Sequence, residues 1–255
     1  MSYQTVLLDK ADGVARITLN RPQVLNAISA GLLNDLKAAL GEAANDDSIG
    51  VVVITGAGRA FSAGVDIKTR DPETGQPVSP SRELALEVLD VIEKLGKPVI
   101  AAVNGHCLTG ALELATACDI IVASERAVFG DTHARWGLTP TWGGSQRLPR
   151  LIGALKAKEL FFTGDILSAA EAERIGLVNR VVPDETLDEA VREMTAKILA
   201  NSRETIRIEK SLVNRGLQMD YAAGLALERR ESPGSTDGAA ARMQSFTNRR
   251  GDDSA

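Results

Sequence analysis

Two short loops of small residues carry the part of this sequence that is best suited to chemistry. The first is residues 61–67, Phe-Ser-Ala-Gly-Val-Asp-Ile, and the second is residues 104–115, Asn-Gly-His-Cys-Leu-Thr-Gly-Ala-Leu-Glu-Leu-Ala. Small residues let a ligand approach the backbone closely, and a helix is expected to begin at Gly110. The first turn of a helix presents N–H groups without intrahelical partners at the positive end of its dipole. One N–H group from each loop would therefore form an oxyanion hole, which stabilises negative charge on a ligand oxygen.

Glu113 follows in the second loop, and it is the only acidic residue between Glu93 and Asp119. A carboxylate in such an apolar stretch is costly to bury unless it is paired or functional. The functional interpretation is an acid–base group beside the oxyanion hole. The structural alternative is a core carboxylate that pairs with an arginine.

Other catalytic motifs with a fixed spacing are missing. Gly56-Ala57-Gly58 follows an apolar run, but Phe61 stands where a dinucleotide-binding GxGxxG needs its third glycine. The sequence has no GxxxxGK(S/T), no GxSxG and no HExxH. Nothing in these patterns supports nucleotide hydrolysis, serine hydrolysis of the elbow type or zinc proteolysis.

Composition indicates a globular chain of 255 residues, long enough for one large domain or two modest ones. The net charge of −5 argues against a broad nucleic-acid-binding surface. Cys107 and Cys118 are expected to be free, buried thiols, and two histidines cannot build a His-rich metal site. The amino terminus lacks a secretory pattern, and polar residues interrupt the apolar window 98–124. We therefore expect a cytoplasmic protein with no nucleic-acid or membrane partner.

The elements that must position these residues alternate between strands and helices up to about residue 182, which predicts an α/β fold. A hairpin is expected over residues 6–19, and buried strands are expected at 51–54, 99–103 and 119–123.

Two amphipathic helices are expected between these strands. Ser29 begins the first, whose core residues are Leu32, Leu36 and Leu40. After a mobile surface loop over residues 70–80, Ser79-Pro80 begins the second, whose core residues are Leu84, Val88, Val91 and Leu95. Beyond residue 182 the pattern is helical.

Taken together, these segments resemble the crotonase family, the enoyl-CoA hydratases and isomerases. The strongest match is Asn-Gly-x-x-x-x-Gly-x-x-Glu-Leu-Ala at residues 104–115, followed by Cys-Asp-Ile. Further matches in the same order are residues 20–22, 25–27, 61–67, 143–148 and 163–178. Order and spacing agree over residues 3 to about 250, so the match is specific although each motif alone is weak.

The resemblance implies a crotonase-like spiral of ββα units in residues 1–185, which binds acyl-CoA, and a C-terminal helical region in residues 186–255, which packs in trimers or dimers of trimers. It implies an acyl-CoA thioester as substrate, with coenzyme A as part of that substrate and with no separate cofactor or metal. The N–H groups of Ala63 and Gly110 match the oxyanion-hole positions and would hold the thioester oxygen. The residues implied in binding the substrate and its coenzyme A group are Val24, Ser62, Val65, Asp66, Ile67 and Thr141, with loop capping as the alternative for Asp66.

Glu113 falls on the family's first catalytic glutamate, which in a hydratase activates the water that adds to C3. His133 falls on the second, where the hydratases carry an acid that exchanges a proton with C2. A histidine can also exchange a proton near neutral pH; its alternative role is to line the pocket. Thr141 and Trp142 are bulkier than the small residues that hydratases place in this loop and would reshape the acyl pocket.

The resemblance therefore favours an enoyl-CoA hydratase with Glu113 and His133 as its acid–base pair. Two alternatives stay open. One is a crotonase-fold isomerase or hydrolase of another acyl-CoA, and the other is an acyl-CoA-binding protein without catalysis.

Overall fold

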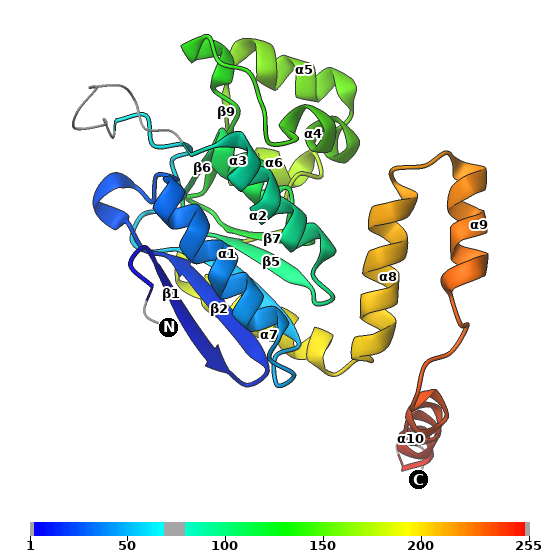
Figure 1. The fold of residues 1–255 in the computed structure, drawn as a ribbon. Helices are drawn as coiled ribbons and strands as arrows, with labels where there is room; N and C mark the ends of the chain where they lie inside the picture. The colour runs from blue at the N-terminus through cyan, green and yellow to red at the C-terminus, as the bar shows by residue number, and fades with distance from the viewer. Residues whose placement is uncertain (1–2, 69–79, 253–255) are drawn as a thin grey trace. The chain divides into compact units, whose positions relative to one another are not determined.

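A six-stranded sheet forms the centre of the first of two units into which the chain divides, residues 1–198 and 199–255 (Figure 1). The computed structural model describes residues 3–68 and 80–252. The sheet has the order β1-β2-β3-β5-β7-β10 and is parallel apart from the β1–β2 hairpin. Its strands are β1 (Val6–Ala11), β2 (Val14–Leu19), β3 (Val51–Gly56), β5 (Val99–Val103), β7 (Ile120–Ser124) and β10 (Arg180–Val182). The predicted hairpin and the three predicted buried strands are confirmed.

A second sheet consists of four short strands, of which the first three are parallel and the last is antiparallel. Its order is β4-β6-β8-β9, and its strands are β4 (Ala60–Ser62), β6 (His106–Leu108), β8 (Val128–Gly130) and β9 (Ile166–Ser168). Each of the strands β3, β5 and β7 is followed by one of the parallel neighbours β4, β6 and β8, and then by a helical segment. This arrangement confirms the predicted α/β fold of ββα units. Because β4, β6 and β8 run parallel, the segments that leave their carboxyl ends lie at one edge of the sheet.

Helices α1 (Ala30–Ala44) and α2 (Arg82–Lys94) contact each other and lie in front of the larger sheet in Figure 1. Ser29 caps α1 as predicted, since its Oγ accepts the N–H of Leu32 at 3.2 Å. The prediction for α2 is partly wrong, because Ser81 rather than Ser79 caps the helix. Most of the expected mobile loop, residues 70–79, lies outside the described residues.

The core face of α2 is also rotated from the prediction. Its buried residues are Ala85, Val88, Leu89 and Ile92, whereas Leu84 and Val91 are only half-buried. Apolar residues flank Val88 and Ile92 on both sides of the helix, so the spacing of apolar residues alone does not show which of them are most deeply buried. The contact with the sheet does.

The remaining helices of the first unit come after β6 in the sequence. They are α3 (Gly110–Ala115), α4 (Gly144–Ile152), α5 (Ala154–Thr163), α6 (Ala169–Arg174) and α7 (Leu187–Leu199). The second unit consists of α8 (Arg203–Gly216), α9 (Tyr221–Glu231) and α10 (Ala239–Asp252), with α8 packed on α9. The helical carboxyl-terminal part is thus confirmed, and the division at residue 185 with a trimerisation role stays a prediction.

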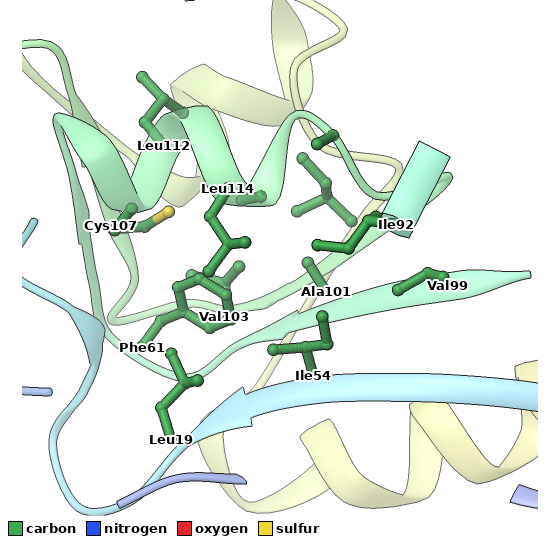
Figure 2. Close-up of a cluster of buried hydrophobic side chains, with 14 of the residues drawn as sticks. Leu19, Ile54, Phe61, Ile92, Val99, Ala101, Val103, Cys107, Leu112 and Leu114 are labelled. Carbon is green, nitrogen blue, oxygen red and sulfur yellow. The ribbon is translucent and has the colours of Figure 1, made fainter. Parts of the chain in front are cut away.

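Buried apolar side chains fill the space between the larger sheet, α2 and α3 (Figure 2). Leu19, Ile54 and Ala101 come from neighbouring strands, and Ile92 and Leu114 come from the two helices. Strands β3 and β5 are buried along their whole length, as continuous apolar runs covered on both faces should be. Neither cysteine forms a disulfide, as expected; Cys107 is buried and Cys118 is half-buried. Burial raises the pKa of the Cys107 thiol.

Gly56 ends β3 where the backbone lies closely against β4, and it supplies a test of this packing. A Cβ at Gly56 would lie 2.0 Å from the carbonyl oxygen of Ala60 and 2.5 Å from that of Phe61. We expect Gly56→Ala to lower the free energy of unfolding by about 3 kcal/mol, measured by urea denaturation. Gly41→Ala in α1 is the matched control, because a Cβ there meets nothing within 4 Å. A Gly56→Ala variant as stable as Gly41→Ala would contradict the packing.

No helix within residues 3–68 and 80–252 is long and apolar enough to cross a membrane. The same residues contain no group of three or more His, Cys, Asp or Glu side chains placed to hold a metal ion.

Candidate active site

The two glycine loops singled out from the sequence come together in the structure. The first begins within β4 and continues beyond it, and the second contains β6 and α3. A Cβ at Gly64 would lie 2.8 Å from the carbonyl oxygen of Leu108 and 3.7 Å from the nitrogen of Gly110, so the two backbones are in contact. Gly64 has a φ of +95°, and this value and the contact together require glycine there.

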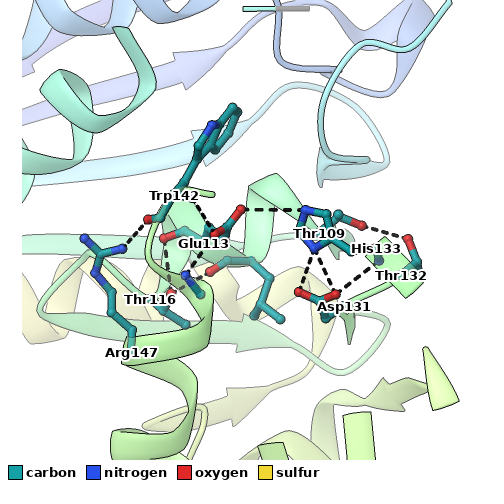
Figure 3. Close-up of polar contacts among 10 residues, drawn as sticks. Thr109, Glu113, Thr116, Asp131, Thr132, His133, Trp142 and Arg147 are labelled. Carbon is teal, nitrogen blue, oxygen red and sulfur yellow. Dashed lines mark hydrogen bonds and ion pairs between the residues drawn. The ribbon is translucent and has the colours of Figure 1, made fainter. Parts of the chain in front are cut away.

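Glu113 lies on α3 with only 2% of its surface exposed. Its Oε1 accepts the backbone N–H of Trp142 at 2.9 Å and that of Gly144 at 2.8 Å (Figure 3). Its Oε2 lies 3.9 Å from Nε2 of His133. Within the described part of the chain no arginine bonds to this carboxylate, so the structural alternative of a Glu–Arg pair in the core is wrong.

His133 begins the short 3-10 helix η2 (His133–Trp136), which follows β8. Its Nδ1 lies 2.9 Å and 3.0 Å from the two carboxylate oxygens of Asp131, and its backbone N–H donates to Oδ1 of Asp131 at 3.1 Å. Because Nδ1 faces a carboxylate, Nδ1 carries a hydrogen and donates it. Nε2 is then the atom that faces Glu113, as Figure 3 shows.

Asp131 was missed by sequence analysis. It is 2% exposed and contacts His133 with both oxygens. The signal was an Asp two residues before a His, a spacing at which the Asp side chain commonly bonds the backbone N–H two residues on. That signal is weak by itself, because it does not show that the imidazole turns back onto the same carboxylate.

The pKa values of both groups are shifted upward. Burial raises the pKa of Glu113, and the two N–H bonds and His133 counteract this only in part. Burial by itself would lower the pKa of His133, but the hydrogen bond that His133 donates to Asp131 and the charges of Asp131 and Glu113 outweigh it and raise that pKa. The site therefore combines a carboxylate that is more basic than usual with an imidazole that holds its proton to a higher pH.

The oxyanion-hole role expected for Ala63 requires a correction. Its N–H donates to the carbonyl oxygen of Leu25 at 2.9 Å, so the fold uses this donor. Gly110, the other expected residue, begins α3, and its N–H has no acceptor among residues 3–68 and 80–252.

Val65 supplies the free N–H of the first loop. The chain pairs there with Ile28, whose N–H bonds the carbonyl of Gly64 at 2.8 Å and whose carbonyl accepts the N–H of Asp66 at 2.9 Å. In such a parallel bridge the N–H of Val65 itself points away from Ile28, and it has no acceptor in the described ranges. A methyl carbon of Val65 lies 3.1 Å from the position of a Cβ at Gly110. We call the N–H groups of Val65 and Gly110 the open donors.

Thr109 sets the start of α3 at a strained backbone position, with φ +55° and ψ −113°. Its N–H donates to the carbonyl of Gly130 at 2.8 Å, and its Oγ1 lies 2.7 Å from Oγ1 of Thr132. These contacts tie the loop of Glu113 to the loop of His133.

The remaining residues expected to bind substrate divide into buried and exposed ones. Ser62 is buried and its Oγ accepts the N–H of Gly64, while Asp66 pairs with Arg21 at 3.0 Å and accepts the N–H of Lys68. Both side chains thus have partners in the fold, which agrees with the capping alternative for Asp66. The side chains of Val24, Ile67 and Thr141 are exposed. The binding roles of all these residues stay predictions.

Trp142 is anchored at both of its backbone groups. Its N–H bonds Glu113, and its carbonyl oxygen accepts Nη1 of Arg147 at 2.6 Å. Nε of Arg147 in turn bonds Glu93 on α2 at 2.6 Å. Gly144 follows, and a Cβ there would lie 3.0 Å from the Glu113 side chain, so this loop needs glycine to approach the carboxylate.

Fold and site together define a two-sheet α/β protein with a buried carboxylate–imidazole pair beside two open backbone donors. The chain belongs to the enoyl-CoA hydratase/isomerase (crotonase) family, whose sequence profile matches residues 9–253. Crotonyl-CoA hydratase from Syntrophomonas wolfei is 38% identical over 229 residues, which cover 89% of this chain and 88% of that protein.

Solved structures agree with this assignment. An enoyl-CoA hydratase from Bacillus anthracis superposes with a TM-score of 0.89 at 36% identity, covering 96% of this chain and 97% of that one. A monofunctional enoyl-CoA isomerase from M. smegmatis gives 0.75 at 39% identity, covering 86% and 97%. The relatives thus include both hydratases and isomerases, so the choice between them depends on the site.

Proposed function

We propose that this protein is an acyl-CoA-processing enzyme that adds water to a 2-enoyl-CoA thioester. The observation that carries the proposal is the 3.9 Å separation of Oε2 of Glu113 and Nε2 of His133, each held by its own partners. One water molecule can contact two atoms at this separation with ordinary hydrogen bonds of about 2.8 Å. The family relatives named as hydratases support the same reaction.

The open donors of Val65 and Gly110 are suited to the thioester carbonyl oxygen. When a nucleophile adds to C3, electrons of the C2–C3 double bond move toward the carbonyl, and negative charge develops on this oxygen. Backbone N–H groups that are already in place stabilise this charge without reorganisation. The start of α3 adds the positive end of a short helix.

Hydration then needs one base and one acid. The Glu113 carboxylate accepts a proton from the water whose oxygen bonds to C3, and Nε2–H of His133 delivers a proton to C2. One O–H bond of water and the C2–C3 π bond break, and one O–C3 and one C2–H bond form, which is the net addition of water. On the enzyme the Nε2–H bond of His133 is lost and an O–H bond on Glu113 is gained. Glu113 ends protonated and His133 neutral, so the proton must return across the gap or through solvent before the next turnover.

The assay that tests this proposal offers crotonyl-CoA, a 3-enoyl-CoA and a saturated acyl-CoA, and identifies the products. We expect 3-hydroxyacyl-CoA as the main product. A shifted double bond without water addition would identify an isomerase, and release of free CoA would identify a hydrolase. Binding without any turnover would identify an acyl-CoA-binding protein. The homotrimer or dimer of trimers and the cytoplasmic location stay predictions.

Asp131 is a positioning residue in this proposal, because it fixes the proton on Nδ1 and turns Nε2 toward Glu113. Asp131→Asn should lower kcat by roughly 10- to 100-fold. It should also lower the pKa of His133, because a negative charge that favours the imidazolium is removed. Hydration requires His133 in its protonated form, so the decline of kcat/KM at high pH should begin at a lower pH.

The matched control is Asp188→Asn, since Asp188 is exposed and pairs with Arg16 away from this site. Its pH profile should equal that of the wild type. An Asp131→Asn profile with an unchanged high-pH limb would remove Asp131 from the role given to it.

A further inference from the structure

Thr109 and Thr132 stand directly before two residues of the site, Gly110 and His133, and their side chains contact each other. We propose that this contact positions the site: it keeps the backbone of Thr109 in the conformation that directs the N–H of Gly110 toward the thioester oxygen, and it ties this donor to the loop of His133. The inference rests on the proposed function, in which the open donors hold that oxygen. Neither threonine is assigned a contact with the reacting atoms, so both are positioning residues.

The backbone of Thr109 is strained. Its φ is +55° and its ψ is −113°. A positive φ is an outlier for a β-branched residue, whereas glycine adopts it readily. Among residues 3–68 and 80–252 the other non-glycine residues with a positive φ are Asp12, Leu25 and Asn26, none of which is β-branched. Such strain persists only where the surrounding structure holds the residue in place.

The conformation of Thr109 directs the N–H of Gly110. Because the peptide bond is planar, ψ of residue 109 orients the peptide group that joins it to Gly110. The carbonyl of that group accepts the N–H of Glu113 at 3.0 Å, within the first turn of α3. The N–H on the opposite side of this trans peptide group is the open donor of Gly110. A change of conformation at residue 109 would turn the group and displace the donor.

The N–H and the side chain of Thr109 both bond the segment that leads to His133. The N–H donates to the carbonyl of Gly130 at 2.8 Å, a bond that any residue other than proline can make. Oγ1 lies 2.7 Å from Oγ1 of Thr132, an ordinary length for a hydrogen bond between two hydroxyl groups (Figure 3). Glycine would fit the backbone conformation of residue 109 better, but it would lose this second bond.

Thr132 does not use its side chain as its position in the chain would suggest. It stands at the N-cap of η2, where a threonine side chain often accepts a backbone N–H of the following turn, but it makes no capping bond. Its hydroxyl group bonds Thr109 instead. The next residue is His133, whose N–H and Nδ1 bond Asp131. The contact thus joins the residue before the oxyanion donor to the residue before the proton donor.

Hydration requires both donors at once. The thioester oxygen and C2 are two covalent bonds apart, so the N–H of Gly110 and Nε2 of His133 must keep a fixed separation. A displacement of about 1 Å can lower a rate by about 100-fold. We therefore expect loss of the threonine contact to reduce kcat in a protein that stays folded.

Substitutions of Thr109 separate the hydroxyl group from the backbone strain. Thr109→Gly removes both, Thr109→Ala removes the hydroxyl group but keeps the strain, and Thr109→Ser keeps the hydroxyl group. We expect kcat for crotonyl-CoA to fall at least about 10-fold in the glycine and alanine variants and to stay within about threefold of wild type in Thr109→Ser. Thr109→Gly should melt about 2 °C or more above Thr109→Ala, because only glycine relieves the strain.

Substitutions of Thr132 test the other side of the contact. Thr132→Val should lower kcat as Thr109→Gly does, and Thr132→Ser should keep it near the wild-type value. The double variant Thr109→Gly, Thr132→Val should be at most about twofold slower than the slower single variant, because both changes break the same contact. The matched control is Thr205→Val, which removes the 2.9 Å contact between the hydroxyl groups of Thr205 and Thr236 in the second unit. Its kcat should equal that of the wild type.

An infrared spectrum of bound butanoyl-CoA, labelled with ¹³C at C1, tests the donor without turnover. Hydrogen bonds from the open donors polarise the carbonyl group and lower its stretching frequency. Thr109→Gly and Thr132→Val should reverse part of this shift, whereas Thr109→Ser and Thr205→Val should keep it. A contact that only stabilises the fold would leave the frequency unchanged in all four variants.

Wild-type kcat in folded Thr109→Gly and Thr132→Val proteins would overturn the inference, and so would single effects that multiply in the double variant. If Thr109→Gly fails to fold, Thr132→Val decides, since it leaves residue 109 itself unchanged. If the wild type binds butanoyl-CoA but hydrates no substrate, the hydratase proposal fails, and the infrared shift alone decides whether the contact positions the donor. If butanoyl-CoA does not bind, both proposals fail.

Discussion

Glu113→Gln should lower the turnover of 2-enoyl-CoA hydration by at least about 100-fold while acyl-CoA binding is retained. The amide oxygen of glutamine can still accept the N–H groups of Trp142 and Gly144, so the side chain keeps its position. An NH₂ group then replaces the oxygen that faces His133, and this group cannot accept a proton from water. The measurements are kcat and KM for crotonyl-CoA and the dissociation constant of butanoyl-CoA.

The stability of this variant distinguishes lost chemistry from lost structure. Burial raises the pKa of Glu113 in the folded protein, so its contribution to stability is present at low pH and is lost as the pH rises through that pKa. Glutamine carries no charge at any pH. Glu113→Gln should therefore melt at or above the wild-type temperature at pH 8.

A second variant, Glu113→Asp, keeps a carboxylate on a side chain one methylene shorter. That carboxylate cannot both bond the two N–H groups and face the water, so we expect an activity between those of wild type and Glu113→Gln. Wild-type turnover in a folded Glu113→Gln protein would make Glu113 a structural residue and end the mechanism given above.

Local signals made the centre of this site predictable from sequence. Glu113 stood alone in an apolar stretch, and the glycines of both loops marked close backbone approaches. Continuous apolar runs placed β3 and β5, because strands covered on both faces have no polar side. In each case the information lay within a few residues of the feature.

The features that were missed depend on contacts between distant segments. Val65 rather than Ala63 supplies the free N–H, because Leu25 and Ile28 bond the loop around Val65. The role of Asp131 depends on the direction in which the His133 ring turns. Trp142 was expected to reshape the site, but its placement against Gly110 depends on Arg147 and Glu113 holding its backbone. The spacing of residues in the sequence does not reveal any of these three contacts.

His133→Ala should lower hydration by at least about 100-fold, because among residues 3–68 and 80–252 no other ionisable side chain is paired with Oε2 of Glu113. In the wild type the rate should fall as the pH rises through the pKa of His133, which Asp131 and Glu113 hold above its ordinary value despite burial. The measurement is kcat/KM for crotonyl-CoA between pH 5 and pH 10, with melting temperatures in parallel. An alanine variant that hydrates at the wild-type rate would exclude His133 as the proton donor.

His133→Glu asks whether a second carboxyl group can take over, as in the hydratases that the sequence resembles. The new carboxyl group would face Asp131, whose oxygens lie 2.9 Å and 3.0 Å from Nδ1 in the wild type, and the two like charges would repel each other. We therefore expect the single variant to restore only part of the activity lost in His133→Ala, and the double variant Asp131→Asn, His133→Glu to restore more, because the repulsion is removed. Equal activity in the single and double variants would show that Asp131 does not act through charge. A His133→Glu protein far more active than wild type would indicate that the natural carboxylate–imidazole pair serves a reaction other than simple hydration.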